Sequence, residues 1–310
     1  MDKLNGIILI DKTHGLSSAE TVSRVKKLCR VSRVGHTGTL DPGATGLLIL
    51  TLGKATKISA YLSNEVKSYR AVIYLGESRD SYDRFGKITD GSECLLNESQ
   101  IESALTDFRG EIEQIIPPYS AVHHDGKRMY ELAREGLEIP AKYRKVKITE
   151  LDLLGYQKPL LSIDVVCSSG TYIRSIAHEL GKKLGCGAHL AGLIRTSVGK
   201  FQLGNAITLS QLEAVVKLRR LNDYIIPIHE VLSLPSLIIN DNKCEGVQYG
   251  QDILNRDIMK LGPDFTAGDT IAVKNKLGNL LAIGTALISS QKVRQNVVPS
   301  EKILEYKRVI

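Results

Sequence analysis

The spacing of apolar residues along the chain predicts several buried strands. Residues 6–10 are almost entirely apolar and indicate a short buried strand, while residues 47–50 indicate a buried strand or helix. Residues 66–76 alternate between apolar and polar side chains, which is typical of a strand with one buried face. Residues 161–167 predict a further buried strand.

Three other segments have the spacing of amphipathic helices, and each follows a residue that can cap a helix. Ser17 and Glu20 have the spacing of a capping box before the first, and Asn97 opens the second, at residues 97–109. Thr171 can cap the third. The apolar residues on one face of each helix are Ala19, Val22, Val25 and Cys29; Ile101, Ala104, Leu105 and Phe108; and Ile173, Ile176, Ala177, Leu180 and Leu184.

The pattern changes after Pro227 and Pro235. Short apolar runs separated by glycines follow, among them residues 270–273 and 280–284. Short strands at such close spacing are typical of a small β-barrel. The chain therefore divides into a larger unit followed by a small barrel.

The composition is moderately basic and rich in tyrosine. Lys and Arg number 41 against 34 Asp and Glu, which gives a net charge of +7 and a pI of about 9.0. Tyr occurs 12 times, whereas Trp is absent. A basic excess suits a polyanionic partner, although many other proteins are as basic, and tyrosine can both stack and hydrogen-bond.

The cysteines and histidines lack the spacing of a disulfide framework or a metal site. The 5 cysteines are scattered without a C-x-x-C pair, which favours reduced thiols in the cytoplasm. His178 is followed by Glu179, but no second histidine completes a zinc-binding H-E-x-x-H motif. No apolar run reaches the ~18 residues of a membrane span, and the N-terminus lacks the apolar core of a signal peptide. We therefore expect a cytoplasmic protein without metal or membrane association.

Residues 35–46 (GHTGTLDPGATG) predict a shaped loop, because four glycines and a proline disfavour both helix and strand. The loop contains one imidazole, His36, and one carboxylate, Asp41. A phosphate-binding loop would require a lysine shortly after Gly43, and none is present. A turn in which Asp41 only accepts backbone hydrogen bonds is favoured on composition alone. A catalytic loop that presents Asp41 to a substrate is the third interpretation and requires support from elsewhere in the chain.

Arg174 occupies an unusual position for a cation. It falls in the first turn of the helix expected after Thr171, where the helix dipole is positive. A cation in such a place suggests a fixed acidic partner. A guanidinium group can hold a carboxylate through two parallel hydrogen bonds.

Residues 117–147 combine lysine and arginine with tyrosine, and they begin with two prolines that favour an extended backbone. A solvated helix and loop would explain this composition. A flexible RNA clamp also explains it, because cations contact phosphates and aromatic rings stack on bases. We favour the clamp.

Four blocks of the sequence resemble the TruB family, the bacterial tRNA pseudouridine-55 synthases. GHTGTLDPGATGLL resembles the catalytic loop of that family and KSYRAVIYLGESRDSYDRFG its second motif, while PPYSAVHHDGKRMYELAREG and CSSGTYIR resemble the third and fourth. The match extends over nearly the whole chain. It departs from the family at two places: Thr13 replaces the usual proline, and Ser78, Asp80, Ser81 and Asp83 replace a Thr-x-Thr-x-Asp pattern.

The resemblance implies that Asp41 is the catalytic carboxylate and that Arg174 is its ion-pair partner. Such a carboxylate suits the reaction, because the sugar carbon becomes electron-poor when the glycosidic bond breaks, and an anion can stabilise or attack it. Arg174 would keep Asp41 ionised by charge pairing.

Four further residues receive substrate-binding roles from the same resemblance. Tyr69 would stack on the target base and Tyr172 would pack beneath it. His36 would fill the gap left when the nucleotide leaves its stack. Arg195 follows the family's C-G-A-H-x-x-x-L-x-R pattern and is a further candidate.

The resemblance also implies the fold and the activity. The fold would be α+β, with a mixed, largely antiparallel sheet flanked by helices at residues 1–233 and an RNA-gripping insertion at about 117–147. A PUA-like β-barrel would occupy residues 234–310. The protein would isomerise uridine 55 in the T-loop of tRNA as a monomer. It would need no guide RNA, and no cofactor or metal, because isomerisation adds no atoms or electrons.

Two alternatives remain open at the level of sequence. A non-catalytic RNA-binding protein would have little use for Asp41, because a carboxylate repels phosphates. A guide-RNA-dependent pseudouridine synthase shares the Asp41 loop but usually carries extra N-terminal sequence.

Overall fold

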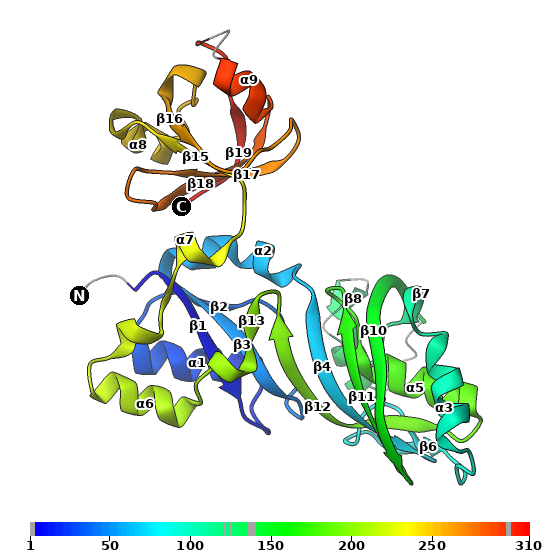
Figure 1. Ribbon diagram of the computed structural model, residues 1–310. Helices are drawn as coiled ribbons and strands as arrows, with labels where there is room; N and C mark the ends of the chain where they lie inside the picture. Colours follow the sequence, from blue (N-terminus) through cyan, green and yellow to red (C-terminus); the bar gives the residue numbers. More distant parts are fainter. Residues whose placement is uncertain (1–3, 121, 125, 136–140, 296–298) are drawn as a thin grey trace.

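The computed structural model describes residues 4–120, 122–124, 126–135, 141–295 and 299–310. These residues form a 10-stranded sheet and a 5-stranded sheet, which lie one above the other in Figure 1. The larger sheet contains β1 Gly6–Lys12, β2 Val34–His36, β3 Thr45–Leu52, β4 Lys67–Leu75, β7 Gly110–Ile115, β10 Tyr143–Gln157, β11 Leu160–Cys167, β12 Ala188–Val198, β13 Phe201–Gln202 and β14 Ile226–Pro227.

The strand order of the larger sheet is β14-β1-β3-β12-β4-β11-β10-β7, with β2 beside β3 and β13 beside β12. Of these pairs only β3 and β12 run parallel, with Thr45 opposite Ile194 and Gly46 opposite Arg195. The expected mixed, largely antiparallel sheet is therefore confirmed. The close parallel pairing requires a glycine, because a Cβ atom at Gly46 (φ +97°) would lie 2.4 Å from the carbonyl oxygen of Arg195.

Helices cover the two faces of this sheet differently. One face packs against α1 Ser18–Cys29, α3 Glu98–Thr106, α5 Ile173–Leu184 and α6 Leu209–Lys217. The other packs against the 3-10 helix η1 Gly53–Ile58 and the short helices α2 Ser59–Ser63 and α7 Ile228–Val231. The remaining elements of this part are β5 Ser78–Arg79, β6 Ile88–Asp90, β8 His123–His124, β9 Lys127–Arg128, α4 Met129–Arg134, η2 Leu203–Asn205 and η3 Leu221–Tyr224.

The covering of the two faces explains why β1 is continuously apolar and why β4 alternates between apolar and polar residues. In β1, Ile8 and Ile10 pack into one core cluster while Ile7 and Leu9 pack into the other, so the strand is apolar at every core position. Strand β4 alternates because its second face is only partly covered, and Arg70 there is exposed. The expected capping box formed at Ser17 with Glu20, and the expected cap at Asn97 is also part of a capping box, with Gln100.

The C-terminal part contains the 5-stranded sheet, in the order β16-β15-β17-β18-β19. Its core includes Leu237, Ile239, Ile271 and Val273. The described residues contain no pairing between the end strands β16 and β19, so closure of the expected barrel is not observed. The elements are β15 Ser236–Ile239, α8 Asp241–Gln248, η4 Asn255–Asp257, β16 Ile258–Leu261, β17 Thr270–Lys274, β18 Leu280–Ala286, α9 Ser290–Gln295 and β19 Leu304–Val309.

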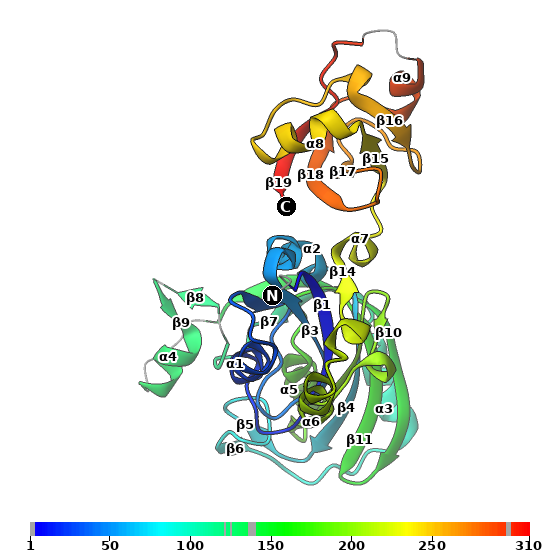
Figure 2. The same cartoon turned by 90° about the vertical axis from the view of Figure 1, so that its left-hand side faces the viewer.

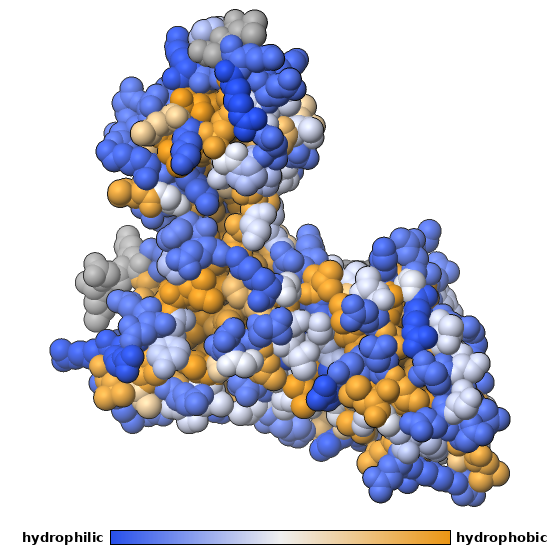
Figure 3. All heavy atoms as spheres, in the orientation of Figure 1, coloured by the Kyte–Doolittle hydropathy of each residue, from blue (hydrophilic) through white to orange (hydrophobic). Residues whose placement is uncertain are grey.

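The two sheets share a hydrophobic core. Ala272, Leu280, Ile283 and Ile310 of the C-terminal part belong to the same buried cluster as residues of β1, β3, η1 and α2. The Nζ atom of Lys57 also donates a hydrogen bond to the carbonyl oxygen of Val309, at 3.0 Å. Figure 3 shows apolar side chains continuing through the neck between the two parts.

The expected insertion at residues 117–147 contains both projecting and sheet elements. The β8–β9 hairpin and α4 project from the body of the protein in Figure 2. Residues 143–147 instead form the first part of β10, which pairs with β7. Positions 121, 125 and 136–140 of this range lie outside the described residues. No described helix is long and apolar enough to cross a membrane.

Candidate active site

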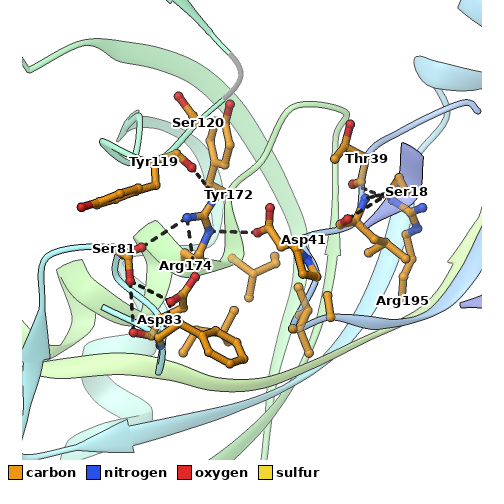
Figure 4. A pocket seen from close by; sticks show the side chains of 18 of the residues that line it. Ser18, Thr39, Asp41, Ser81, Asp83, Tyr119, Ser120, Tyr172, Arg174 and Arg195 are labelled. Atoms are coloured by element: carbon orange, nitrogen blue, oxygen red, sulfur yellow. Dashed lines mark hydrogen bonds and ion pairs between the residues drawn. The ribbon is translucent and has the colours of Figure 1, made fainter. Parts of the chain in front are cut away.

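A cavity of about 1440 Å³ opens between the loop before β3, strand β4, the segment at residues 80–87 and the start of α5. All six residues singled out from the sequence line it. Figure 4 shows Asp41 between two arginines, with Arg174 on one side and Arg195 on the other. The six lining residues are His36, Asp41, Tyr69, Tyr172, Arg174 and Arg195.

Buried polar groups fix the backbone on both sides of Asp41. The hydroxyl of Ser18 donates a hydrogen bond to the carbonyl oxygen of Leu40 at 2.9 Å and accepts one from its N–H at 2.8 Å. The fully buried ammonium of Lys12 donates to the carbonyl oxygens of Leu16, at 2.6 Å, and Pro42, at 3.5 Å. Burial lowers the pKa of Lys12 to about 8, although the charge of Asp41 opposes this shift. The carboxylate is therefore carried by a preorganised loop.

Arg174 forms an ion pair with Asp41. The position of Arg174 at the start of a helix predicted such an acidic partner. Its Nε lies 3.0 Å from Oδ2 of Asp41, with the Arg174 side chain 7% exposed and that of Asp41 45% exposed. Its other two nitrogens donate to backbone carbonyl oxygens, Nη1 to Ser81 at 3.2 Å and Nη2 to Tyr119 at 3.0 Å. The structure thus contains a single contact to Asp41 instead of two parallel hydrogen bonds. The guanidinium group joins three segments, and the carboxylate remains open to the cavity.

Asp83 is a second carboxylate beside Arg174, to which the sequence interpretation gave no role. Its Oδ2 lies 3.7 Å from Nη1 of Arg174. Its Oδ1 accepts hydrogen bonds from the hydroxyl of Ser81, at 2.7 Å, and from the N–H of Phe85, at 3.0 Å. Asp83 therefore holds the 81–85 segment against the cation. The sequence feature that could have indicated a role for Asp83 is its position in the second TruB-like motif, where this chain departs from the family pattern.

Tyr69 and Arg195 lie opposite each other on neighbouring strands, β4 and β12. Burial raises the pKa of Tyr69, and the positive charge of Arg195 partly offsets the effect. The guanidinium of Arg195 is 2% exposed and donates to the carbonyl oxygens of Leu47 at 2.7 Å, Gly38 at 3.0 Å and Thr39 at 3.4 Å. Arg195 thereby supports the loop that carries Asp41, and Tyr69 is a neutral, recessed ring.

His36 ends β2 and faces the same cavity. Its Nδ1 accepts a hydrogen bond from the N–H of Gly38 at 3.4 Å. Burial lowers the pKa of His36, and the charge of Arg195 adds to the effect. The imidazole is accordingly a neutral ring at neutral pH, which suits contact with an uncharged base.

The start of α5 differs from the prediction by one position. Tyr172, and not Thr171, is the N-cap residue, and the hydroxyl of Thr171 donates instead to the carbonyl oxygen of Ser168 at 2.9 Å. Arg174 nevertheless falls in the first turn, as expected. The ring of Tyr172 lies 6.0 Å from the guanidinium carbon of Arg144.

Gln114 is a residue that sequence reasoning missed. It is 2% exposed, and its side-chain amide accepts a hydrogen bond from the N–H of Tyr172, at 2.7 Å, and donates one to its carbonyl oxygen, at 3.0 Å. One amide of β7 thus holds both backbone groups of the N-cap residue of α5. The only signal was a polar residue at an inward-facing position of a strand.

The segment after β7 completes the rim of the cavity. Tyr119, Ser120 and Tyr130 line it, and the N–H of Tyr130 donates to the carbonyl oxygen of Ser120 at 3.0 Å. Across the described parts of the chain, no group of three or more His, Cys, Asp or Glu residues has the geometry to hold a metal ion.

Comparison with known proteins extends these observations to a family. The model of the TruB family pseudouridylate synthase N-terminal domain matches residues 26–173. The models of the tRNA pseudouridylate synthase B C-terminal domain and of the PUA domain match residues 174–233 and 235–303.

Curated relatives match over most of their length. A tRNA pseudouridine synthase B from Dehalococcoides mccartyi is 43% identical over 252 residues, which cover 81% of this chain and 84% of the relative. One from Solibacter usitatus is 38% identical over 287 residues, which cover 92% and 97%. One from Pelotomaculum thermopropionicum is 37% identical and covers 91% and 92%.

Solved structures of larger complexes are also similar. An H/ACA RNP bound to a substrate RNA containing 2′-deoxyuridine aligns with a TM-score of 0.75 and 27% identity, over 99% of this chain and 85% of the other. A Cbf5-Nop10-Gar1 complex aligns with a TM-score of 0.76 and 28% identity, over the same shares.

The fold and these matches define the protein as a pseudouridine synthase, an isomerase with a C-terminal PUA domain. Within that class, the chain belongs to the TruB family. The expected resemblance is therefore confirmed.

Proposed function

We propose that the protein converts uridine 55 in the T-loop of tRNA to pseudouridine, as a monomer in the cytoplasm and without a guide RNA. The support for this substrate is identity of about 40% to tRNA pseudouridine synthase B relatives. Identity to the H/ACA structures is lower, at 27% and 28%. The observation that carries the proposal is the Asp41–Arg174 ion pair inside a cavity large enough for a nucleotide.

In the proposed mechanism the target uridine leaves the T-loop and enters the cavity, at a cost of a few kcal/mol in lost stacking. The bond between the sugar carbon C1′ and the base nitrogen N1 breaks, the base turns, and a bond forms between C1′ and base carbon C5. The hydrogen on C5 leaves as a proton, and N1 takes up a proton, so no atoms or electrons are gained overall.

Asp41 acts on the electron-poor intermediate of this reaction. Its half-exposed carboxylate can stabilise or attack the positive centre that develops when the glycosidic bond breaks. Arg174 orients this group, because the buried guanidinium is held by two carbonyl groups and cannot follow the carboxylate if it moves. Asp83 balances the charge of Arg174 and fixes its plane.

Tyr69 and Tyr172 hold the base, whereas His36 and Arg195 have other roles. Tyr69 provides a recessed ring on which the uracil stacks, and Tyr172 packs beneath it. His36, neutral at the rim, fills the gap that the flipped nucleotide leaves in the RNA. Arg195 acts by supporting the loop backbone.

We assign the chemistry to residues 1–233 and additional RNA affinity to residues 234–310. All the residues assigned a part in the reaction precede residue 234. The basic insertion at about 117–147 would grip the T-arm, because it lies at the rim of the cavity through Tyr119 and Tyr130.

Tritium release from C5-labelled uridine in an unmodified tRNA transcript tests the proposal. The purified protein alone should release tritium from one site per transcript, and mapping should place that site in the T-loop. Activity that appears only after a small RNA or a partner protein is added would support the guide-dependent alternative. RNA binding without release under any condition would support a binding protein.

A further inference from the structure

Phe85 is a large apolar side chain left 61% exposed at the edge of the active-site cavity. The guanidinium carbon of Arg84 lies 5.1 Å from the centre of its ring. The ring of His14 lies 6.1 Å away, tilted by 38°. All three side chains line the cavity that contains Asp41, so the exposed ring belongs to the surface that substrate RNA must cross.

Gly43 allows the ring to lie directly on the catalytic loop. A Cβ atom at this position would be 2.3 Å from Cε2 of Phe85, so any side chain here would displace the ring. Gly43 follows Asp41 by two residues, which limits the distance between their Cα atoms to about 7 Å. The ring therefore lies against the loop that carries Asp41 and lines the same cavity.

The backbone that carries Phe85 is held rigidly. Its N–H donates to Oδ1 of Asp83 at 3.0 Å. The Nη1 atom of Arg79 donates to the carbonyl oxygens on either side, of Arg84 at 3.0 Å and of Gly86 at 2.8 Å. Because Asp83 also faces Arg174, the position of the ring is tied to that of the catalytic ion pair. An exposed ring on a fixed backbone is preorganised for a partner.

We propose that Phe85, flanked by Arg84 and His14, is a stacking platform for the nucleobase next to the target uridine. The inference rests on the proposed function, since it requires an RNA whose uridine occupies the cavity. Extracting that uridine removes a stacking partner from its neighbour, and an exposed aromatic ring beside a cation can replace the lost contact. If Phe85 only covered Gly43, any apolar side chain of similar size would serve equally well.

Substitutions of Phe85 distinguish stacking on a nucleobase from simple covering of Gly43. With an unmodified tRNA transcript and tritium release as the assay, Phe85→Ala should raise KM about five- to a hundredfold, the range for one lost base–aromatic stack. Its kcat should stay within about twofold, because Asp41 and Arg174 are untouched. Phe85→Leu, which keeps an apolar cover, should lose as much as alanine, whereas Phe85→Tyr should keep the wild-type KM. The matched control is Ile88→Ala, which removes a side chain of similar exposure, 62%, outside the cavity.

Abasic RNA identifies the stacked base. In a T-arm hairpin, removing the base on one side of the target uridine should raise KM for the wild type but not further for Phe85→Leu. The stacking proposal would be overturned if Phe85→Leu had the wild-type KM, or if removing the base raised KM equally in both proteins. Phe85 would then serve only to cover Gly43. A wild-type protein that releases no tritium would instead overturn the proposed function, so the two failures are distinguishable.

Discussion

At the scale of single residues, the site is built around cations whose hydrogen bonds connect segments far apart in the chain. An acidic partner for Arg174 was predictable because a cation at the start of a helix needs an acidic neighbour, and the family resemblance identified that partner as Asp41. The single-contact geometry of the pair was not, since the carbonyl groups of Ser81 and Tyr119 reach Arg174 only after three segments meet. The contact between Asp83 and Arg174 could not be predicted for the same reason.

Arg174→Lys should reduce kcat on the order of a hundredfold, although the charge is kept. A lysine cannot contact Asp41 while also donating to the carbonyl groups of Ser81 and Tyr119, so the carboxylate would be misplaced, and small displacements have effects of this size. Single-turnover tritium release measures the change, and RNA affinity measured in parallel should stay near the wild-type value. Turnover close to normal would show that Arg174 is an ordinary phosphate-binding cation.

Because Lys67 is buried, the free energy of unfolding should depend on pH. Lys67 is 5% exposed, and burial lowers its pKa from 10.5 to about 8, with the charge of Arg195 adding to the effect. Between these values the unfolded chain binds more protons than the folded one, so the free energy of unfolding should rise with pH in this window. Relative to Lys67→Met, which lacks the titration, the wild type should gain at most about 1.4 kcal/mol per pH unit. Urea unfolding of both proteins between pH 7.5 and 9.5 tests this, and a constant difference would contradict it.

At the scale of elements, strands and helices followed from local patterns, but their ends and contacts did not. The capping boxes at Ser17 and Asn97 formed because all their atoms lie within one turn. The start of α5 depends on Gln114, a residue 58 positions earlier in the chain than Tyr172. Periodicity carries no information about a contact made across such a distance.

Gln114→Leu should lower both stability and turnover. The N–H of Tyr172 would lose its hydrogen-bond acceptor, at about 1–3 kcal/mol, and the first turn that carries Arg174 would lose its side-chain connection to β7. Melting temperature and kcat report the two effects. Gln100→Leu is the matched control, because the Gln100 side chain also accepts a backbone hydrogen bond, from Asn97 at 2.9 Å, at the cap of α3. It should lower stability without a specific loss of kcat, and equal kcat per folded molecule in both variants would refute the positioning role of Gln114.

At the scale of the whole molecule, the C-terminal sheet shares a buried apolar cluster with β1, β3, η1 and α2 of the catalytic part. Sequence patterns predicted a separate unit after Pro235 but not this packing, because they show which faces are apolar and not which faces meet. Ile283 and Ile310 share a core with Ile7 and Leu9. The two domains are therefore coupled in stability.

Removing residues 234–310 should accordingly do more than weaken RNA binding. The truncated protein would expose apolar side chains of this shared cluster that are now buried, and each large one left uncovered costs about 1.5–3 kcal/mol. We expect a lower melting temperature and self-association, measured by calorimetry and sedimentation, with turnover retained at saturating RNA in the fraction that stays folded. An unchanged melting temperature would show that the shared core contributes little.

The central claim is that Asp41 is the catalytic carboxylate, and Asp41→Asn tests it most directly. Asparagine has nearly the same shape, so the loop held by Ser18 and Lys12 should persist, but it cannot act as an anion toward the sugar carbon. The account predicts tritium release at background, an unchanged melting temperature, and RNA affinity equal to or tighter than wild type, because one negative charge near the phosphates is gone. Full turnover per bound RNA in this variant would contradict the assignment of Asp41.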